Sequence, residues 1–201
     1  MWKRSWLSRE VLLFSAFSGV ATAYAGAIWF GVSGGLAVGA LTVLLGIAGV
    51  TASACIYRVS SRPAWNTPFT VLQFLLTAGV LGPLFAAAVG AGDRFWLAAA
   101  AATLAGAQLL LLAVRFFRLI ASDSVELRGT ARLLSTTLAS RFVGRGGLLV
   151  LGGIVLPLVG DAWLALACAF GGELLGRYLF FVSVVPKHMA APYLASESEA
   201  A

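Results

Sequence analysis

The chain carries no charged side chain between Val11 and Tyr57. A helix that spans a membrane needs about 20 predominantly apolar residues, so this run is too long for one such helix and suits two. Three glycines in the "GVSGG" stretch at residues 31–35 permit a tight reversal between them. Across the whole chain 60% of the residues are hydrophobic and 11% are charged, whereas soluble domains are about one quarter charged. The sequence therefore predicts a multi-pass membrane protein.

The remaining apolar runs predict an all-α transmembrane helical bundle of about six spans. The expected spans are residues 9–31, 35–57, 68–90, 95–120, 142–159 and 161–185. Pro68 suits the first turn of the third span, because proline lacks the N–H group that this turn leaves unpaired. The fifth span is the shortest, and it contains Pro157.

Residues 121–140 differ from the spans because charged residues alternate with leucine and alanine at helical spacing. This pattern predicts one amphipathic helix that lies at the membrane surface. We interpret residues 1–194 as a single transmembrane bundle domain and residues 195–201, "ASESEAA", as a disordered acidic tail. A cleaved signal peptide is the alternative for the N-terminal segment, which is basic and precedes an apolar run. We favour a spanning helix because that run continues through Phe30.

The basic residues gather on one side of the predicted topology, which we call face A. With six spans, face A holds both termini, the loop between the second and third spans, and the 121–140 segment. It carries Lys3, Arg4, Arg9, Arg58, Arg62, Arg115, Arg118, Arg128, Arg132, Arg141, Arg145 and Lys187. The opposite side has Arg94 with Asp93 and Asp161. Because basic loops are retained in the cytoplasm, face A is predicted to be cytoplasmic, and the arginines are interpreted as loop residues rather than as a nucleic-acid surface.

The cysteine and histidine content argues against a redox centre within this chain. Cys55 and Cys168 form no C-x-x-C pair, and the single histidine, His188, cannot supply the two axial ligands that a membrane b-type haem usually has. We therefore expect no haem, no metal and no catalytic residue. Gln73 and Gln108 lie within spans and are interpreted as interhelical hydrogen-bond partners rather than as ligands.

One pair of ionisable residues lies inside the sixth span. Glu173 is predicted near the middle of the membrane, with Arg177 one turn closer to face A on the same side of the helix. A charge at that depth costs about 2.5 to 3.5 kcal/mol on insertion scales and usually faces a polar interior. The pair either neutralises itself within the helix or lines a polar pocket or proton path that opens to face A. The neighbouring ring of Tyr178 suits a flat apolar headgroup.

Two other groups of residues at face A are candidates for binding. Arg9 and Glu10 open the first span, where Glu10 is either a first-turn charge that complements the helix dipole or part of a site. The loop at residues 62–66 combines a cation, a proline, an amide and Trp65. Trp65 is alternatively an aromatic anchor at the membrane surface.

Three segments together resemble the membrane-anchor subunits of the dimethyl sulfoxide reductase type of molybdoenzyme complex, a family that overlaps the sulfite dehydrogenase anchors. They are "SWLSREVLLF" at 5–14, "IYRVSSRPAWNTPFTVLQFLL" at 56–76 and "GRYLFFVSVVPKHMA" at 176–190. The resemblance implies a haem-free, non-catalytic helical subunit that binds quinone or quinol, menaquinone or ubiquinone, as a diffusible substrate. It also implies electron exchange with an iron–sulfur subunit, which serves a molybdopterin catalytic subunit.

The resemblance also implies roles for the charged residues. Face A becomes the docking surface for the iron–sulfur subunit, with contacts expected at Arg58, Arg62, Trp65, Arg128, Arg132 and Lys187. The residues expected to bind quinone or to support its pocket are Glu173, Arg177, Tyr178, Arg9 and Glu10. The implied location is the cytoplasmic (inner) membrane of a bacterium, in anaerobic or sulfur-compound respiration.

The chain departs from the family pattern at its start. The family usually has two further spans before the "SWLSREVL" segment, and the stretch that joins them carries a histidine and an acidic residue implicated in quinol binding. Met1 lies only a few residues before that segment. Either the start is misassigned, or the chain is a fragment or a shortened variant whose quinone site is incomplete. No position in these residues inherits that histidine. The partner face is periplasmic in the dimethyl sulfoxide reductase branch and cytoplasmic in the sulfite dehydrogenase branch, and the arginine bias favours the second.

Two other functions are compatible with the same residues. A small polytopic transporter or channel would use the Glu173 and Arg177 pair as a gate or proton relay, and it would work without soluble partners. A purely structural anchor would hold its partners at the membrane without quinone chemistry.

The predicted topology is testable with reporters of membrane sidedness. Fusions after Ala201 and within the Gly90–Arg94 turn are expected to give opposite signals, with the Ala201 fusion in the cytoplasm. Periplasmic activity of the Ala201 fusion would overturn the orientation, and equal signals at both sites would overturn the even number of spans.

Overall fold

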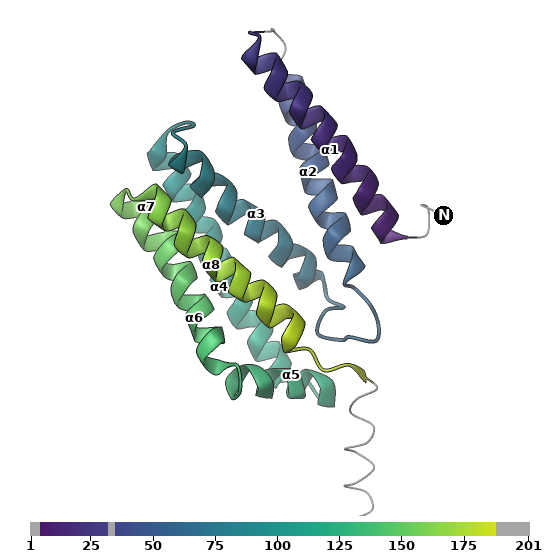
Figure 1. The fold of residues 1–201 in the computed structure, drawn as a ribbon. Helices are drawn as coiled ribbons and strands as arrows, with labels where there is room; N and C mark the ends of the chain where they lie inside the picture. Colours follow the sequence, from purple (N-terminus) through teal and green to yellow (C-terminus); the bar gives the residue numbers. More distant parts are fainter. Residues whose placement is uncertain (1–4, 32–34, 188–201) are drawn as a thin grey trace, which may run out of the picture. The chain divides into compact units, whose positions relative to one another are not determined.

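The computed structural model describes residues 5–31 and 35–187, and it divides them into two compact units that meet at Arg58 and Val59. The described residues form helices joined by turns and contain no strand (Figure 1). Six of the helical segments are long and apolar enough to span a membrane. The all-α fold with about six spans is therefore confirmed. The two units are described separately below, so the assignment of residues 1–194 to one domain stays a prediction.

The first unit is a hairpin of two antiparallel helices, α1 (Trp6–Trp29) and α2 (Gly35–Ile56). Glycines of α2 let aromatic rings of α1 approach the helix backbone. The Phe14 ring lies over Gly49, where an added Cβ would be 3.2 Å from it, and the Tyr24 ring lies over Gly39 at 3.1 Å. Small residues are common at such contacts because helices in lipid associate largely through close packing.

The start of α1 corrects one prediction. The helix begins at Trp6, earlier than the expected residue 9, so Glu10 lies beyond the first turn and does not act there as a dipole-complementing charge. The guanidinium of Arg9 lies 4.5 Å from the ring centroid of Trp6. If the helix had begun at residue 9, Trp6 would have lain outside it.

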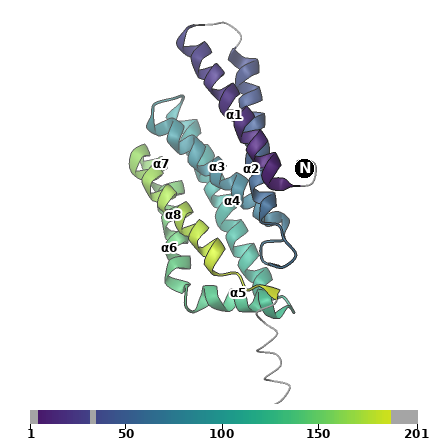
Figure 2. The same ribbon diagram turned by 45° about the vertical axis from the view of Figure 1, so that its right-hand side comes forward.

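The second unit contains the other four spans and one surface helix (Figure 2). The elements are α3 (Pro68–Ala88), α4 (Arg94–Ile120), α5 (Val125–Ser135), α6 (Ala139–Val150), η1 (Leu151–Val155), α7 (Leu156–Val159) and α8 (Ala162–Val182). Pro68 is in the first turn of α3, as predicted. The carboxylates opposite face A are helix caps, since Asp93 accepts from the N–H of Phe95 at 2.8 Å and Asp161 from that of Leu164 at 3.1 Å.

The fifth span is continuous, although it changes helix type near Pro157. The segment Ala139–Val159 is long and apolar enough to cross a membrane, and its middle part, η1, is a π-helix. Pro157 has no N–H to donate to the carbonyl of residue 153, and its ring crowds that turn. A wider π-helical turn just before the proline relieves this crowding, which explains why the proline does not end the span.

Helix α5 confirms the predicted amphipathic segment. Thr130, Ala131 and Leu134 are buried, whereas Arg128 and Arg132 on the same helix are exposed. The apolar side packs through Leu134 against α8, in a cluster that also includes Leu138 and Leu179. The predicted acidic tail at residues 195–201 and His188 lie outside the described residues.

The core of the second unit is made of small side chains that bring α3, α4 and α8 close together. Its fully buried residues are Val80, Leu84, Ala101, Ala105, Ala165 and Ala169. The fifth span enters this core through two glycines. A Cβ on Gly152 would lie 2.3 Å from the backbone nitrogen of Ala169, and a Cβ on Gly153 would lie 2.5 Å from the Cβ of Ala105. The α8 contact therefore requires glycine at residue 152.

We expect the change Gly152→Ala to lower the free energy of unfolding by about 1 to 3 kcal/mol, because the new methyl group meets backbone atoms that cannot move aside. The matched control is Gly106→Ala on α4, where an added Cβ has no neighbour within 4 Å. Thermal unfolding of the detergent-purified proteins compares the two, and equal stability would contradict the close packing of η1 on α8.

Candidate functional site

The carboxylate of Glu173 is held inside the second unit by side chains from two other helices. Its Oε2 atom accepts a hydrogen bond of 2.7 Å from the Thr77 hydroxyl of α3. Its Oε1 atom accepts one of 2.5 Å from the Gln108 amide of α4. Glu173 is 4% exposed and Gln108 is 1% exposed. A carboxylate on α8 therefore joins three spans through polar contacts in an otherwise apolar core.

Arg145 lies deep in the second unit, although the sequence suggested a loop position. It belongs to α6, is 4% exposed, and packs over Gly176, where an added Cβ would be 2.6 Å from its Cζ atom. Its guanidinium is attracted by Glu173 and repelled by Arg177. The absence of a side chain at residue 176 is what makes room for the guanidinium beside α8.

Arg115 also lies inside a span, the one predicted at residues 95–120, and not in a loop between spans. It lies within α4, and its guanidinium donates hydrogen bonds to the Gln73 side chain of α3 and, at 3.5 Å, to the carbonyl of Ala64. Gln73 is thereby an interhelical hydrogen-bond partner, as expected, but its partner is a charged group. Arg115 connects the membrane interior to the loop that precedes α3.

The two other predicted residues of α8 lie on different sides of that helix. The Arg177 guanidinium is 3.5 Å from the ring centroid of Phe74 on α3. Tyr178 is half-exposed, and its ring lies 5.3 Å from the guanidinium of Arg141 on α6. Arg177 thus faces the same helix as Glu173, whereas Tyr178 belongs to another surface.

The charges of this cluster do not cancel. Arg115, Arg145 and Arg177 contribute three guanidinium groups, and Glu173 is the only acidic residue in the four spans of the second unit. Opposite charges and hydrogen bonds stabilise ions that have been removed from water. An interior with this excess of positive charge therefore favours an anionic or electron-rich ligand, and Glu173 supplies one group that can exchange a proton.

A small cavity lies between these helices. It measures about 50 Å³ and is bordered by Gln73, Arg115, Arg145, Gly176 and Ser183. One water molecule occupies about 30 Å³ in the liquid, so this space has the size of one or two waters and is too small for an organic ring. Arg145, which borders this space, can therefore support a ligand bound nearby but not enclose one, and Glu173 is not among the lining residues.

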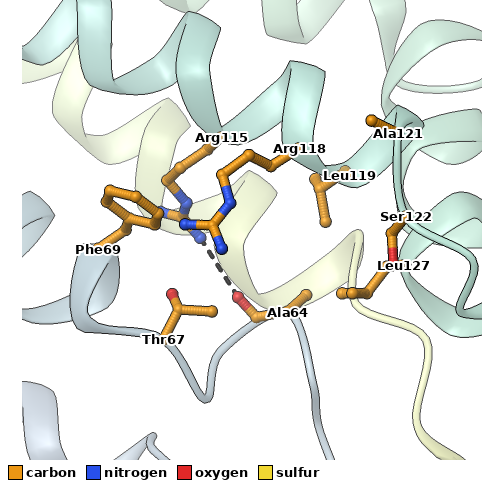
Figure 3. A pocket seen from close by; sticks show the side chains of 9 residues that line it. All are labelled: Ala64, Thr67, Phe69, Arg115, Arg118, Leu119, Ala121, Ser122 and Leu127. Carbon is orange, nitrogen blue, oxygen red and sulfur yellow. Dashed lines mark hydrogen bonds between the residues drawn. The ribbon is translucent and has the colours of Figure 1, made fainter.

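A larger cavity of about 340 Å³ opens at the face A end of the unit (Figure 3). Its wall includes Ala64, Thr67, Phe69, Arg115, Arg118 and Ser122. The guanidinium of Arg118 lies 4.8 Å from the ring centroid of Phe69. Arg115 borders both cavities, so it separates the surface opening from the polar interior.

The face A end of the second unit brings together three segments that are distant in the sequence. Trp65 stacks on Phe180 at 4.9 Å, and its ring N–H donates to the Phe180 carbonyl at 2.9 Å. The backbone N–H of Lys187 donates to the carbonyl of Ser61 at 3.1 Å, and that of Val185 to the Thr130 hydroxyl at 3.3 Å. The loop before α3, helix α5 and the segment after α8 therefore converge at this end.

The predicted docking residues differ in exposure at this end. Arg128, Arg132 and Lys187 are exposed, whereas Trp65 is 6% exposed and fixes the loop to α8 instead of presenting its ring. The guanidinium of Arg62 lies 4.3 Å from the Trp65 ring centroid. On α5, a hydrogen bond from the Ser124 hydroxyl lowers the pKa of the Glu126 carboxyl below its ordinary value, so this carboxyl adds a negative charge to the surface.

Three of the predicted residues, Arg9, Glu10 and Arg58, belong to the first unit. Their assignment to the quinone site (Arg9 and Glu10) and to the docking surface (Arg58) stays a prediction.

Comparison with known proteins agrees with this membrane architecture. A family model described as the DMSO reductase anchor subunit (DmsC) matches residues 2–182. The chain belongs to this family.

Two relatives are similar to this chain in sequence. A sulfite dehydrogenase subunit from Allochromatium vinosum is 37% identical over 105 residues, which cover 45% of this chain and 32% of that protein. The anaerobic dimethyl sulfoxide reductase chain YnfH of Escherichia coli K12 is 31% identical over 201 residues, which cover 88% of this chain and 68% of YnfH. No solved structure matches the chain.

The sequence pattern of this anchor identified the ionisable residues of α8 but missed most of their partners. Thr77 is an ordinary hydroxyl in an apolar span, and a glutamine such as Gln108 can bond to many groups. Arg145 stands near the start of a span, where arginines usually reach the membrane surface. The glycine that makes room for Arg145 is Gly176 on α8, so no local pattern around Arg145 marked it as buried.

The hydrogen bond between Gln108 and Glu173 can be tested by replacing either residue. The change Gln108→Leu is expected to lower stability by about 1 kcal/mol, since the buried carboxylate loses a donor. The effects of Gln108→Leu and Glu173→Leu should be non-additive because the residues are in contact. Thr103→Val, which removes an exposed hydroxyl from α4, is the control. Additive effects in thermal unfolding would contradict the interaction.

Proposed function

We propose that this chain is the membrane anchor of a bacterial molybdoenzyme complex and passes electrons between a membrane quinone and an iron–sulfur subunit. The proposal rests on membership of the DMSO reductase anchor family and on the charge balance around Glu173. A quinone that accepts electrons carries negative charge until it is protonated. Fixed positive groups and a proton-exchanging carboxylate in a low-dielectric interior suit that chemistry.

The observation that carries the quinone proposal is the position of Glu173 and Arg177 on one side of α8, against α3. Glu173 bonds to Thr77, and Arg177 lies over the ring of Phe74 one turn away. A quinone headgroup that reaches this side of α8 meets a guanidinium donor and an aromatic ring first. Glu173, which is buried, acts behind them as a supporting group and proton acceptor.

Face A provides the surface for the iron–sulfur partner, which in turn serves a molybdopterin catalytic subunit. Arg128 and Arg132 of α5 and Lys187 after α8 are exposed on one end of the second unit. Basic residues at such a surface guide an acidic partner into place and add to its association rate. The arginine bias favours a cytoplasmic face A in the bacterial inner membrane, the arrangement that the sulfite dehydrogenase branch suggests.

The buried polar cluster also favours a second candidate, a small transporter or channel. Ionisable residues within spans often belong to ion or proton pathways, and Arg115, Gln73 and the small cavity lead from the face A end toward Arg145. A transporter would move its substrate without soluble partners. The anchor requires them for quinone-linked turnover.

The double change Glu173→Leu with Arg177→Leu is expected to leave the subunit inserted and bound to its partners, but to reduce quinone-linked turnover at least about tenfold. The reason is that an ion pair alone can be replaced by apolar groups at little cost, whereas a site that stabilises negative charge cannot, since one such donor is typically worth about 100-fold or more. Turnover of the complete complex is measured with a quinone analogue and with an artificial electron carrier that bypasses the membrane subunit.

The control is Tyr178→Leu, which lies on the other side of α8 beside Arg141 and should leave quinone-linked turnover close to that of the unmodified complex. Full quinone-linked turnover of the double variant would show that the pair is structural. Loss of turnover with both electron carriers, or loss of the partner subunits, would indicate damage to the assembly instead of to a quinone site. Substrate uptake by the chain alone in vesicles would favour the transporter.

A further inference from the structure

We propose that the cavity of about 340 Å³ at the face A end binds the phosphate group of an anionic phospholipid, such as phosphatidylglycerol or cardiolipin. The site is distinct from the side of α8 assigned above to quinone, and the inference does not depend on that assignment. Its main residues are Arg115, Arg118 and Thr67.

Two guanidinium groups enter this cavity without a compensating acid. Figure 3 shows the Arg115 and Arg118 side chains reaching over Thr67 and Phe69 from the last turns of α4. None of the nine residues that line the cavity is aspartate or glutamate. Two positive groups in one partly closed space repel each other, and an anion between them removes that repulsion. Arginine suits phosphate because its N–H groups form a planar fork that matches two phosphate oxygens.

The contacts of the two arginines leave suitable donors for such an anion. Phe69 covers a face of the Arg118 guanidinium, with 4.8 Å between the ring centroid and Cζ. A cation–π contact uses the face of the group, so the N–H donors at its edge stay available. Arg115 is oriented by the Gln73 side chain and the Ala64 carbonyl. Both side chains are therefore held in position before a ligand arrives.

Thr67 provides a second, independent indication of a polar ligand. Its hydroxyl oxygen is buried and has no hydrogen-bond partner among the described residues, which is uncommon in folded proteins. Thr67 lies in the wall of the cavity and precedes Pro68, the first residue of α3. Its side chain makes no capping bond to α3, so it does not satisfy the first N–H groups of that helix, where the positive end of the helix dipole lies.

The position in the membrane favours a lipid over a free ion. The cavity lies where α4 ends and α3 begins, and the ends of spanning helices are where lipid headgroups are expected. The last turns of α4 also expose Phe117 and Ile120, which offer an apolar surface for acyl chains. Basic pockets between spans on the cytoplasmic side of a membrane are typical binding sites for anionic headgroups. A phosphate tethered to acyl chains therefore satisfies both the charged cavity and its apolar border.

The test measures lipid binding to the full-length chain in detergent by native mass spectrometry. Phosphatidylglycerol and phosphatidylcholine are compared, because both carry phosphate but only the first has a net negative charge. The unmodified protein is expected to retain phosphatidylglycerol at least about fivefold more than phosphatidylcholine, and Arg118→Gln to remove most of that preference. Thr67→Val should weaken retention while keeping the size and shape of the side chain. Arg132→Gln, an exposed arginine of α5 outside the cavity, is the matched control.

Several outcomes would overturn the proposal. Equal loss of preference in Arg118→Gln and Arg132→Gln would show that general surface charge, not the cavity, attracts the lipid. Retention of the preference in both Arg118→Gln and Thr67→Val would exclude this site. If inorganic phosphate alone protects the protein against thermal unfolding as well as phosphatidylglycerol does, the cavity is a site for a free ion. Displacement of phosphatidylglycerol by a short-chain quinone would assign the cavity to the quinone substrate. If added phosphatidylglycerol shifts the Tm of every variant by the same amount, the lipid acts on the protein in general and not through the cavity.

Discussion

A carboxylate inside a membrane bundle must obtain its hydrogen bonds from the protein, because the hydrocarbon core has no water to supply them. Glu173 meets this constraint with donors from α3 and α4, and the arrangement of the second unit follows from it. The helices must lie close enough for short side chains such as Thr77 to reach α8. Alanine and glycine at the crossing points, including Ala105, Ala169 and Gly152, provide that closeness. In this unit the hydrogen bonds to Glu173 therefore depend on the tight packing of the helices.

The arginines form a graded series from the surface to the interior. Arg128 and Arg132 are exposed on α5, Arg118 and Arg115 border the larger cavity, and Arg145 is buried beside Glu173. Arginine therefore has a different role at the surface and in the interior. At the surface it sets the topology and can attract an acidic partner. In the interior it counters the charge of Glu173 and would stabilise an electron-rich ligand.

Much of the fold could be predicted because apolar periodicity and helix signals are local properties of the chain. The spans, the amphipathic helix at α5 and the start of α3 at Pro68 all came from composition over a few turns. The boundaries that failed were helix starts: α1 begins at Trp6 instead of residue 9, and the fifth span begins at Ala139 instead of residue 142. The π-helical turn before Pro157 was also not predicted. None of these can be recognised from average hydropathy.

The sequence by itself determined that this is a six-span helical membrane protein of the DMSO reductase anchor type with an ionisable pair in its last span. Only the tertiary structure decided what surrounds that pair. Local pattern places Glu173 and Arg177 on one helix, but not Gln108 and Thr77 beside the carboxylate or Arg145 over Gly176. Residues from α3, α4 and α6 are 28 to 96 positions away in the chain. Their proximity depends on how closely the helices pack, and a helical repeat carries no information on which face of one helix meets which face of another.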